Sequence, residues 1–591
     1  LARFSDKLNL YSEVLSNTSK MKSDWGRAGS IQRRMKAYEP EFGLRVQREK
    51  LIKEVLREYG GTDRINDLVD RLQSVDLNNT KAINQLIYSM TKTKWQKLSD
   101  GAYELWINGL LSNPPTHAAN IVGNSLALVM SYPERLMGAG VEVIRSKIVG
   151  EPRQIFAGET IRDIFSVVKG THDGTKAFLN SMKTGEGFGK LEFRPTAFPK
   201  GMQMFMPTRA LVAEDVFFKS FIQNAELNRL AYRKAVQEGL KGQSRNLRIT
   251  ELLSNPTEGM LEEAFKRADY TTFNKELGKI GNLVLHSRNI VPGLNYFVPF
   301  IRTPVNIAKY TLERTPLNLG RIIYKAGKGE MVGAELSESV ARMITGSFLG
   351  LGSYLWAKEG VITGGGPKTK AERDEWLRTH QPYSIRIRGK DYSYARFEPI
   401  SSIIGMSADF AELEKNMTEG EKIKVGGAIA GAISKNITSK TFTQGFARLN
   451  DAISDPERYG EQTIESLASS IIPGVVGGVA RMIDPELKDA KGILDKVRSR
   501  IPFVSKGVQP KLNIWGDVIV EEGHPAFRFI SPMKVKTVSE IPIDIELSRL
   551  KLNLGMPSKK IGNKELTREE YTKYIVSSGQ LAKEILNQLV Q

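Results

Sequence analysis

The stretch from Leu110 to Asn124, LLSNPPTHAANIVGN, places a turn-forming SNPP sequence between apolar residues. It lies inside a longer run, Leu105 to Pro133, that contains no Lys, Arg, Asp or Glu. A membrane-spanning helix needs about 20 mostly apolar residues, but the two prolines fall in the middle of this run and break a helix there. We therefore predict two helices, one ending near Leu111 and one beginning around Thr116 as N-cap, and favour buried helices over a membrane-active segment.

Outward from this turn, the composition of the 591-residue chain is that of an ordinary globular protein, with 40% hydrophobic and 26% charged residues. Lys and Arg number 85 against 66 Asp and Glu, which gives a net charge of +19. Such a charge favours contact with nucleic acid, anionic lipid or an acidic protein surface without choosing among them. The lack of Cys excludes disulfides, thiolate catalysis and Cys-based zinc sites. Because the chain starts at Leu1 with no signal-peptide pattern, we expect a fragment of a longer chain.

Apolar residues recur along the chain mainly with helical spacing. We therefore predict a mainly α fold, an elongated multi-helix assembly of short helices with Gly and Pro joints and one small β-hairpin near residues 384–397. The predicted regions are an N-terminal helical region (1–100), a helical domain (101–330) with an irregular insert (150–207), a second helical domain that holds the hairpin (331–505), and a loop-rich segment with C-terminal helices (506–591).

Two segments give the clearest local predictions. Residues 208–239 predict one long, mostly buried helix, with Thr208 as its cap and Gly239 as its stop. The sequence PYSIRIRGKDYSYARFEP alternates apolar and polar residues on both sides of Gly389 and Lys390, which predicts a hairpin with these two residues in the turn. Four apolar blocks rich in small residues are interpreted as core helices in preference to membrane elements: residues 105–133, 343–357, 425–434 and 466–480.

Residues with catalytic or metal-binding chemistry are sparse. The histidines, His117, His172, His286, His380 and His524, show no metal-ligand spacing. KAGKGEM and ITGGGPKTK are rich in Gly, but neither has the phosphate-binding pattern GxxxxGK[ST]. We interpret Glu335 and Glu338 in GAELSESVAR as a solvated helix face and not as the convergent carboxylates of a glycosidase. We predict no catalytic, cofactor-binding or metal-binding residue, and we expect that the chain is not an enzyme.

Basic residues are spread along the chain and are not gathered with aromatic residues as in single-strand binding platforms. RSKIVGEPRQ, KGILDKVRSR and SPMKVKTV are candidates for phosphate contacts without sequence specificity. A solvated basic surface is the other reading of these three segments.

Several stretches together resemble one family. LLSNPPTHAANIVGN is similar to the LS.P.TH..N..GN stretch of large internal virion or DNA-ejection proteins of tailed bacteriophages, in their α-helical, large polyvalent protein associated region. Further landmarks follow in the family's order: AEDVFFKSFIQNAELNRLAYRKA, TTFNKELG, FVPFIRTPVNIAKYTLERTPL, ITGGGP, QPYSIRIRGKDYSYARFEPI, SADFAEL and the final ELTREEYTKYIVSSG. The resemblance covers roughly residues 100 to 591 and rests on this order.

The resemblance implies a structural protein that is packaged in the capsid near the portal and ejected with or before the genome. It implies assembly with sister proteins into a conduit across the host envelope. The implied partners are further copies of the chain in a ring, the other ejection proteins and the portal, packaged DNA, and the host inner membrane after ejection. Family members often carry a murein transglycosylase or protease module upstream. No such module is visible in this sequence, and the resemblance carries over no catalytic residue.

We expect the landmarks to shape the structure at two places. The first turn and helix pair hold Pro114, Pro115, His117, Asn120 and Asn124, and a kinked joint holds Pro299, Phe300, Arg302, Thr303 and Pro304. Two other functions stay open. A murein-degrading enzyme segment would depend on Glu335, Glu338 or Glu398, and a DNA-binding capsid core scaffold would make no contact with a membrane.

Overall fold

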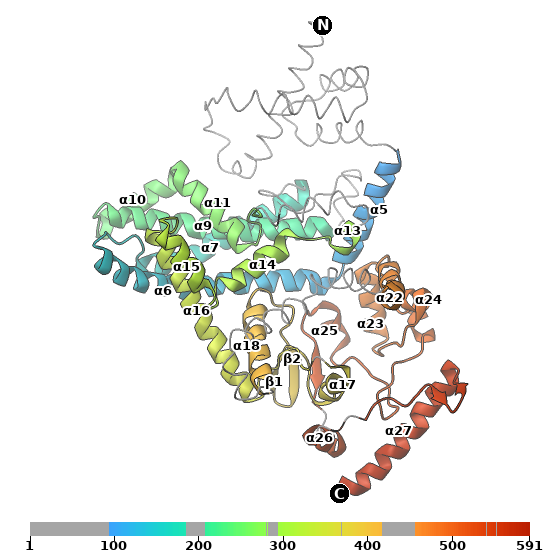
Figure 1. Ribbon diagram of the computed structural model, residues 1–591. Helices are drawn as coiled ribbons and strands as arrows, with labels where there is room; N and C mark the ends of the chain where they lie inside the picture. Colours follow the sequence, from blue (N-terminus) through green and yellow to red (C-terminus); the bar gives the residue numbers. More distant parts are fainter. Residues whose placement is uncertain are drawn as a thin grey trace. The chain divides into compact units, whose positions relative to one another are not determined.

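The chain is mainly helical, and the strands among the described residues form two small sheets, as Figure 1 shows for the computed structural model. This confirms the predicted mainly α fold with a small hairpin. The structure describes residues 94–184, 207–278, 281, 294–367, 369–415, 456–538, 541–550, 552 and 554–590. The predicted helices before residue 94 and the apolar block at 425–434 lie outside these residues.

The chain divides into two compact units, and each is discontinuous in sequence. One unit contains the residues up to Asn108 together with Arg162–Lys275. The other unit contains Gly109–Ile161 together with Glu276–Gln591. The four regions expected from the sequence stay a prediction.

The SNPP turn separates two helices, as predicted. Helix α5 (Lys94–Leu111) ends at the expected residue, and α6 (Pro114–Val149) begins two residues before Thr116, because Asn113 and not Thr116 is the N-cap. The two prolines occupy the first helical positions, where a backbone N–H has no helical partner to lose. Helix α6 runs for 36 residues, so the chain contains long helices beside the short ones predicted.

The region predicted as an irregular insert contains a 28-residue helix, α7 (Ala157–Thr184), so this prediction was wrong for residues 157–184. Glycines are typical of loops, but two of those in this helix allow close packing. A Cβ on Gly170 would lie 3.1 Å from the Phe221 ring, and one on Gly174 would lie 3.0 Å from the Phe217 carbonyl oxygen. Gly in this helix therefore marks an approach of two helices and not a chain break.

Three helices follow in the first unit: α9 (Pro207–Gln237), α10 (Gly242–Ser254) and α11 (Glu258–Thr271). Helix α9 confirms the long helix expected over 208–239, and Gly239 follows it with a positive φ of 76°. Both α10 and α11 pack against α9. Their shared core consists of Leu230, Ala231, Ala235, Ile249, Leu252 and Met260.

In the second unit, α16 (Gly333–Lys358) packs against both α6 and α18 (Ile400–Lys415). Three shorter helices precede α16 along the chain: α13 (Leu294–Phe297), α14 (Arg302–Leu312) and α15 (Asn318–Gly327). The apolar block predicted at 343–357 thus lies within α16, as a helix that packs on two neighbours.

The predicted hairpin is present as β1 (Ser384–Ile387) and β2 (Lys390–Ser393), preceded by α17 (Lys370–Thr379). Its two-residue turn is Arg388–Gly389, one residue earlier than expected, with φ of 50° and 73°. A distant strand, β3 (Val535–Thr537), pairs antiparallel with β2. The pairing of β3 with β2 could not be predicted from the sequence pattern, because more than 140 residues, from 393 to 535, separate the two strands.

The C-terminal part of the second unit is a series of short elements followed by one long helix. The elements are α22 (Pro456–Ser469), α23 (Gly474–Ile483), α24 (Gly492–Arg498), the 3-10 helix η1 (Val504–Gly507), α25 (Pro525–Ile530), α26 (Pro542–Arg549), the pair β4 (Lys560–Ile561) and β5 (Lys564–Glu565), and α27 (Arg568–Val590). Among the described residues, no single helix has the length and apolar composition to cross a membrane. Thr463–Ser469 and Gly474–Ile483 together do, but with a bend of 87° between them.

Candidate functional site: contacts among the sequence landmarks

The SNPP turn is held by a segment that lies far away in the sequence. The Ser112 hydroxyl accepts a hydrogen bond of 3.0 Å from the Val475 backbone N–H, which belongs to the first turn of α23. A Cβ on Gly474 would lie 2.9 Å from the Asn113 Cβ. The apolar block predicted at 466–480 therefore packs against the turn, and its Gly is needed at the contact.

The end of α5 caps the start of α9. The Asn108 side-chain oxygen accepts hydrogen bonds from the backbone N–H of Thr208 at 3.0 Å and from its hydroxyl at 2.8 Å. Thr208 was predicted to cap this helix itself, but it lies inside the first turn, and Asn108 supplies the acceptor. A cap from another helix cannot be seen in the local sequence.

The landmark residues of α6 lie along its first three turns. Pro114 and Pro115 begin the helix, and His117 follows in the first turn, half-buried. The Asn124 side-chain amide donates a hydrogen bond of 3.1 Å to the Asn120 side-chain oxygen, one turn before it.

Gly123, beside Asn124, is the point where α6 meets the ARFEPI segment. A Cβ on Gly123 would lie 2.3 Å from the Glu398 carbonyl oxygen, so no other residue fits without movement of one backbone. Glu398 was one of the acids on which a murein-cleaving function would depend. Its carboxylate accepts a hydrogen bond of 2.6 Å from the Ser402 hydroxyl.

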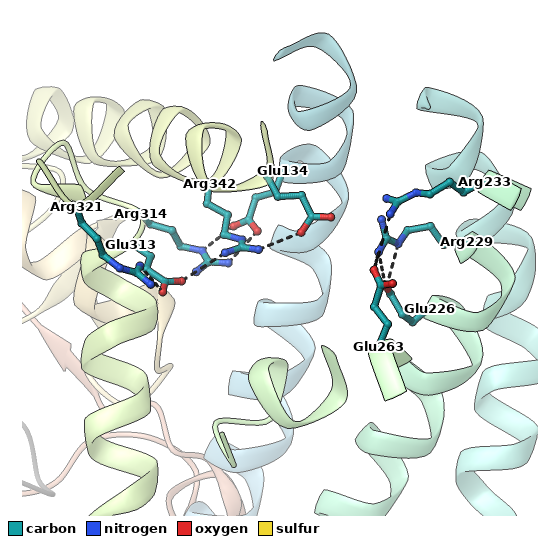
Figure 2. Close-up of polar contacts among 10 residues, drawn as sticks. Glu134, Glu226, Arg229, Arg233, Glu263, Glu313, Arg314, Arg321 and Arg342 are labelled. Atoms are coloured by element: carbon teal, nitrogen blue, oxygen red, sulfur yellow. Dashed lines mark hydrogen bonds and ion pairs between the residues drawn. The ribbon is translucent and has the colours of Figure 1, made fainter. Parts of the chain in front are cut away.

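A buried ion pair joins α6 to the LERTPL landmark (Figure 2). The Arg314 guanidinium donates to both carboxylate oxygens of Glu134, at 2.6 and 2.8 Å, and both side chains are at most 3% exposed. The Tyr310 ring packs against the guanidinium at 3.2 Å from its centroid. Loss of either charge would leave the other buried without its counter-charge, which typically costs about 3–5 kcal/mol.

Around this pair, Figure 2 also shows Glu313 between Arg321 and Arg342. Its carboxylate lies 2.8 Å from the Arg321 guanidinium and 3.6 Å from that of Arg342. Arg342 in turn pairs with Glu338 at 3.0 Å. Glu338, which together with Glu335 was considered for catalysis, therefore belongs to an ion-pair network, and Glu335 is exposed in the first turn of α16.

A second buried carboxylate on α6, Glu142, organises the start of α16. It accepts two hydrogen bonds of 2.9 Å from Arg145, one of 2.6 Å from the Ser337 hydroxyl and one of 2.7 Å from the Gln154 backbone N–H. Burial alone raises the pKa of Glu142, but these donors outweigh it and leave the pKa below its ordinary value. The carboxylate is therefore a charged anchor for three segments of the second unit.

The kinked joint expected at the FVPFIRTP landmark lies between α13 and α14. Val298 and Ile301 are buried there with Leu277 in one apolar cluster. Pro299 and Phe300 lie in the break, whereas Arg302, Thr303 and Pro304 form the first turn of α14.

The Gly-rich landmark ITGGGP is clamped by carboxylates from the SADFAEL landmark on α18. The backbone N–H groups of Gly364 and Gly366 donate to Glu412 at 2.7 and 3.0 Å, and that of Gly365 donates to Asp409 at 2.8 Å. In a Gly-rich anion-binding loop such N–H groups bind a phosphate, whereas here they bind two carboxylates of the same protein.

The QPYSI landmark joins the same clamp. The Tyr383 hydroxyl donates a hydrogen bond of 3.1 Å to the second oxygen of Asp409, and the Asp409 side chain is fully buried. Three landmarks that are separate in the sequence are thus tied together by one carboxylate.

In the first unit, the AEDVFFK and TTFNKELG landmarks also meet. The Lys219 ammonium is buried 3.0 Å from Asp215 and 3.2 Å from Asp269, and the Asn274 amide donates to Asp215 at 2.8 Å. Burial alone lowers the pKa of Lys219, but the two carboxylates outweigh it and raise the pKa, so the ammonium stays charged.

The other cluster in Figure 2 joins α9 to α11 in the same unit. Arg229 donates to Glu226 at 3.0 Å and approaches Glu263 at 3.5 Å, and Arg233 lies 3.8 Å from Glu263. Glu226 and Arg229 are almost fully buried, so this pair belongs to the helix interface.

Several basic residues considered for phosphate contacts are used inside the protein. In the first basic segment, Arg145 is buried against Glu142 and Glu151. In the second, Lys496 pairs with Glu465 at 2.6 Å. In the third, the Lys536 ammonium donates to three carbonyl oxygens at the end of α17, those of Leu377, Arg378 and His380. The charges that remain for a partner are therefore fewer than the sequence count implies.

No protein-family model, curated protein or solved structure matches this chain. Within the described residues, no group of three or more His, Asp or Glu side chains is arranged to hold a metal ion.

Sequence reasoning found the landmarks but not the residues that connect them. Glu134, Arg314, Asp409 and Glu412 were not singled out, because each contact spans a long stretch of chain: 180 residues for the Glu134–Arg314 pair. The sequence holds one signal for these contacts, an acidic residue at the end of a long run without charge. The run without charge ends at Pro133, and Glu134 follows it directly.

Proposed function

We propose that this chain is a non-enzymatic structural protein of the interior of a tailed-phage virion. In this proposal it oligomerises near the portal, leaves with the genome and helps to form a conduit across the host envelope. One observation carries the proposal: several of the family-like landmarks, which are spread over the sequence, contact one another through hydrogen bonds, from Asn274 to Asp215 and from Gly365 and Tyr383 to Asp409. If the landmarks mark one structural region that this chain shares with the family, they should pack together in this way.

Exposed apolar rows on two helices support assembly into larger structures. On α6, Val129, Leu136, Ile144 and Ile148 recur at helical spacing and are 50–79% exposed. On α16, Phe348, Leu351, Leu355 and Trp356 are 50–65% exposed. Apolar patches of this kind mark protein or membrane contacts, since isolated soluble proteins rarely carry large ones. They suit further copies of the chain, sister ejection proteins, the portal, or lipid.

The net charge of +19 supports contact with packaged DNA through phosphates, without sequence specificity. The same charge would favour the anionic surface of the host inner membrane after release. Charge alone also fits a DNA-binding capsid core scaffold, so the membrane step is the one that separates these two functions.

The test is flotation of the purified chain with anionic liposomes, with and without short duplex DNA, across a salt series. The conduit role predicts that the protein floats and stays with lipid at high salt. Protein that remains in the aqueous fraction and binds only DNA, with affinity falling steeply as salt rises, would favour the core scaffold. Release of soluble fragments from purified peptidoglycan would favour the murein-degrading alternative and contradict a non-enzymatic role.

A matched pair of variants sharpens this test. Leu136→Gln with Ile144→Gln removes two side chains from the α6 row and should reduce both oligomer formation and flotation. Leu247→Gln changes one exposed leucine on α10, outside both rows, and should leave both unchanged. Equal effects from the two variants would show that the α6 row has no special part in assembly.

A further inference from the structure

A small pocket lies in the C-terminal part of the second unit. Its volume is about 200 Å³, and three chain segments and the first turns of α27 line it. The charged lining residues are four cations and one acid: Lys491, Lys511, Lys559, Arg568 and Asp489. The excess of positive charge makes the pocket attractive to an anion.

Two of the four cations are already neutralised inside the protein. Lys491 pairs with Asp489 at 3.1 Å, and Arg568 pairs with Asp495 at 2.6 Å. Lys511 and Lys559 are exposed, and neither forms an ion pair with any residue that the structure describes. Two ammonium groups at the pocket are therefore left for a ligand.

Arg568 is already held by the protein. One of its terminal nitrogens bonds Asp495 and the other bonds the Asp489 carbonyl oxygen. Its Nε–H is buried, so a ligand in the pocket does not reach it. The two lysines are therefore the cations that a ligand would contact.

We propose that this pocket binds a phosphate group, held by the Lys511 and Lys559 ammonium groups. Its volume of about 200 Å³ is below the roughly 300–1,000 Å³ of pockets for drug-sized ligands, so it suits one or two phosphoryl groups and not a whole nucleotide. Lys and Arg are the usual partners of phosphate oxygens. Such a site would exist whatever the role of the whole chain, so it stands apart from the proposed function.

The first experiment is calorimetric titration of the full chain with pyrophosphate at constant ionic strength. The wild type should bind with saturation, and Lys559→Glu and Lys511→Glu should each bind at least about tenfold more weakly, the usual effect of losing a charge-assisted hydrogen bond. Lys560→Glu is the matched control: it changes the neighbouring exposed residue, which does not line the pocket, by the same charge. It should bind within about threefold of the wild type.

The second experiment distinguishes a free phosphate from a phosphate in the DNA backbone, with a labelled short duplex measured by fluorescence anisotropy. A selective loss in Lys559→Glu and Lys511→Glu, beyond that in Lys560→Glu, would assign a phosphodiester to the pocket even where pyrophosphate does not bind. Equal losses in all three variants, together with no saturable binding of pyrophosphate, would overturn the proposal. Because all three lysines are exposed, unchanged thermal unfolding serves as the check of folding.

Discussion

At the scale of single residues, Gly346 sets how closely α16 approaches the Arg314 backbone. A Cβ on Gly346 would lie 2.2 Å from the Arg314 carbonyl oxygen. We expect Gly346→Ala to lower the free energy of unfolding by about 2–4 kcal/mol. The backbones at Gly346 and Arg314 must move apart, and this movement also displaces the Glu134–Arg314 pair. Denaturant unfolding would measure the effect.

Gly352 in the same helix provides the control, because a Cβ there meets nothing within 4 Å. Gly352→Ala should be neutral or stabilise by up to about 1 kcal/mol through helix propensity. Similar losses from both alanines would mean that the glycines act through the helix itself and not through the contact.

The free energy of unfolding should depend on pH partly through one side chain, His380. Its ring stacks on Trp376 at 5.0 Å, and burial together with Arg386 lowers its pKa to about 4, from 6.5. The unfolded chain therefore binds a proton between pH 6.5 and 4 that the folded chain does not, so stability falls as the pH drops through this range. From pH 7 to 5 the His380 contribution should fall by about 2 kcal/mol.

The variant His380→Phe keeps a flat ring against Trp376 but has no proton to bind. Its loss of stability from pH 7 to 5 should be about 2 kcal/mol smaller than that of the wild type. Carboxylates of lowered pKa also lose stability on acidification, but they do so equally in both proteins. Parallel curves of unfolding free energy against pH would contradict the role given to His380.

At the scale of elements, the clamp of Asp409 and Glu412 should order the GGG loop. We expect Asp409→Asn, which keeps the side-chain shape but removes its charge, to weaken the bonds from Gly365 and Tyr383. The loss should be about 2 kcal/mol, and the loop amides should exchange hydrogen at least about tenfold faster.

Hydrogen exchange followed by mass spectrometry on peptides that cover 361–368 would measure this. Glu414→Gln lies on the same helix but bonds Tyr354 on α16 and not the loop, so it should leave the loop amides unchanged. Unaltered exchange in Asp409→Asn would mean that the loop is ordered without the clamp.

The elements predicted best from the sequence were those that local interactions decide. The hairpin depends on alternation and on a turn with two positive φ angles, and the break after Leu111 depends on two prolines, so both were predictable to within a residue or two. Helix α7 was missed because a glycine that admits a neighbouring ring looks, in sequence, the same as a glycine that ends a helix. The clamp and the buried pairs depend on contacts between distant segments, which spacing cannot reveal.

At the scale of the whole molecule, two discontinuous units make a prediction about unfolding. Each unit has its own buried charge: Lys219 between Asp215 and Asp269 in one, and Glu134 with Arg314 in the other. Since these contacts lie within units, we expect calorimetry to show two transitions. Lys219→Met should lower the temperature of one transition and Glu134→Gln that of the other. Each variant should reduce the free energy of unfolding of its own unit by about 3–5 kcal/mol.

The double variant decides between independent and coupled units. With independent units, each single variant should lower only its own transition, and the double variant should lower both by the same amounts as the single variants. A single transition that both variants lower would mean that the units unfold together. In that case the rearrangement that the proposed conduit role requires would have to involve the whole chain at once, whereas independent units would allow one to reorganise while the other keeps its buried pairs.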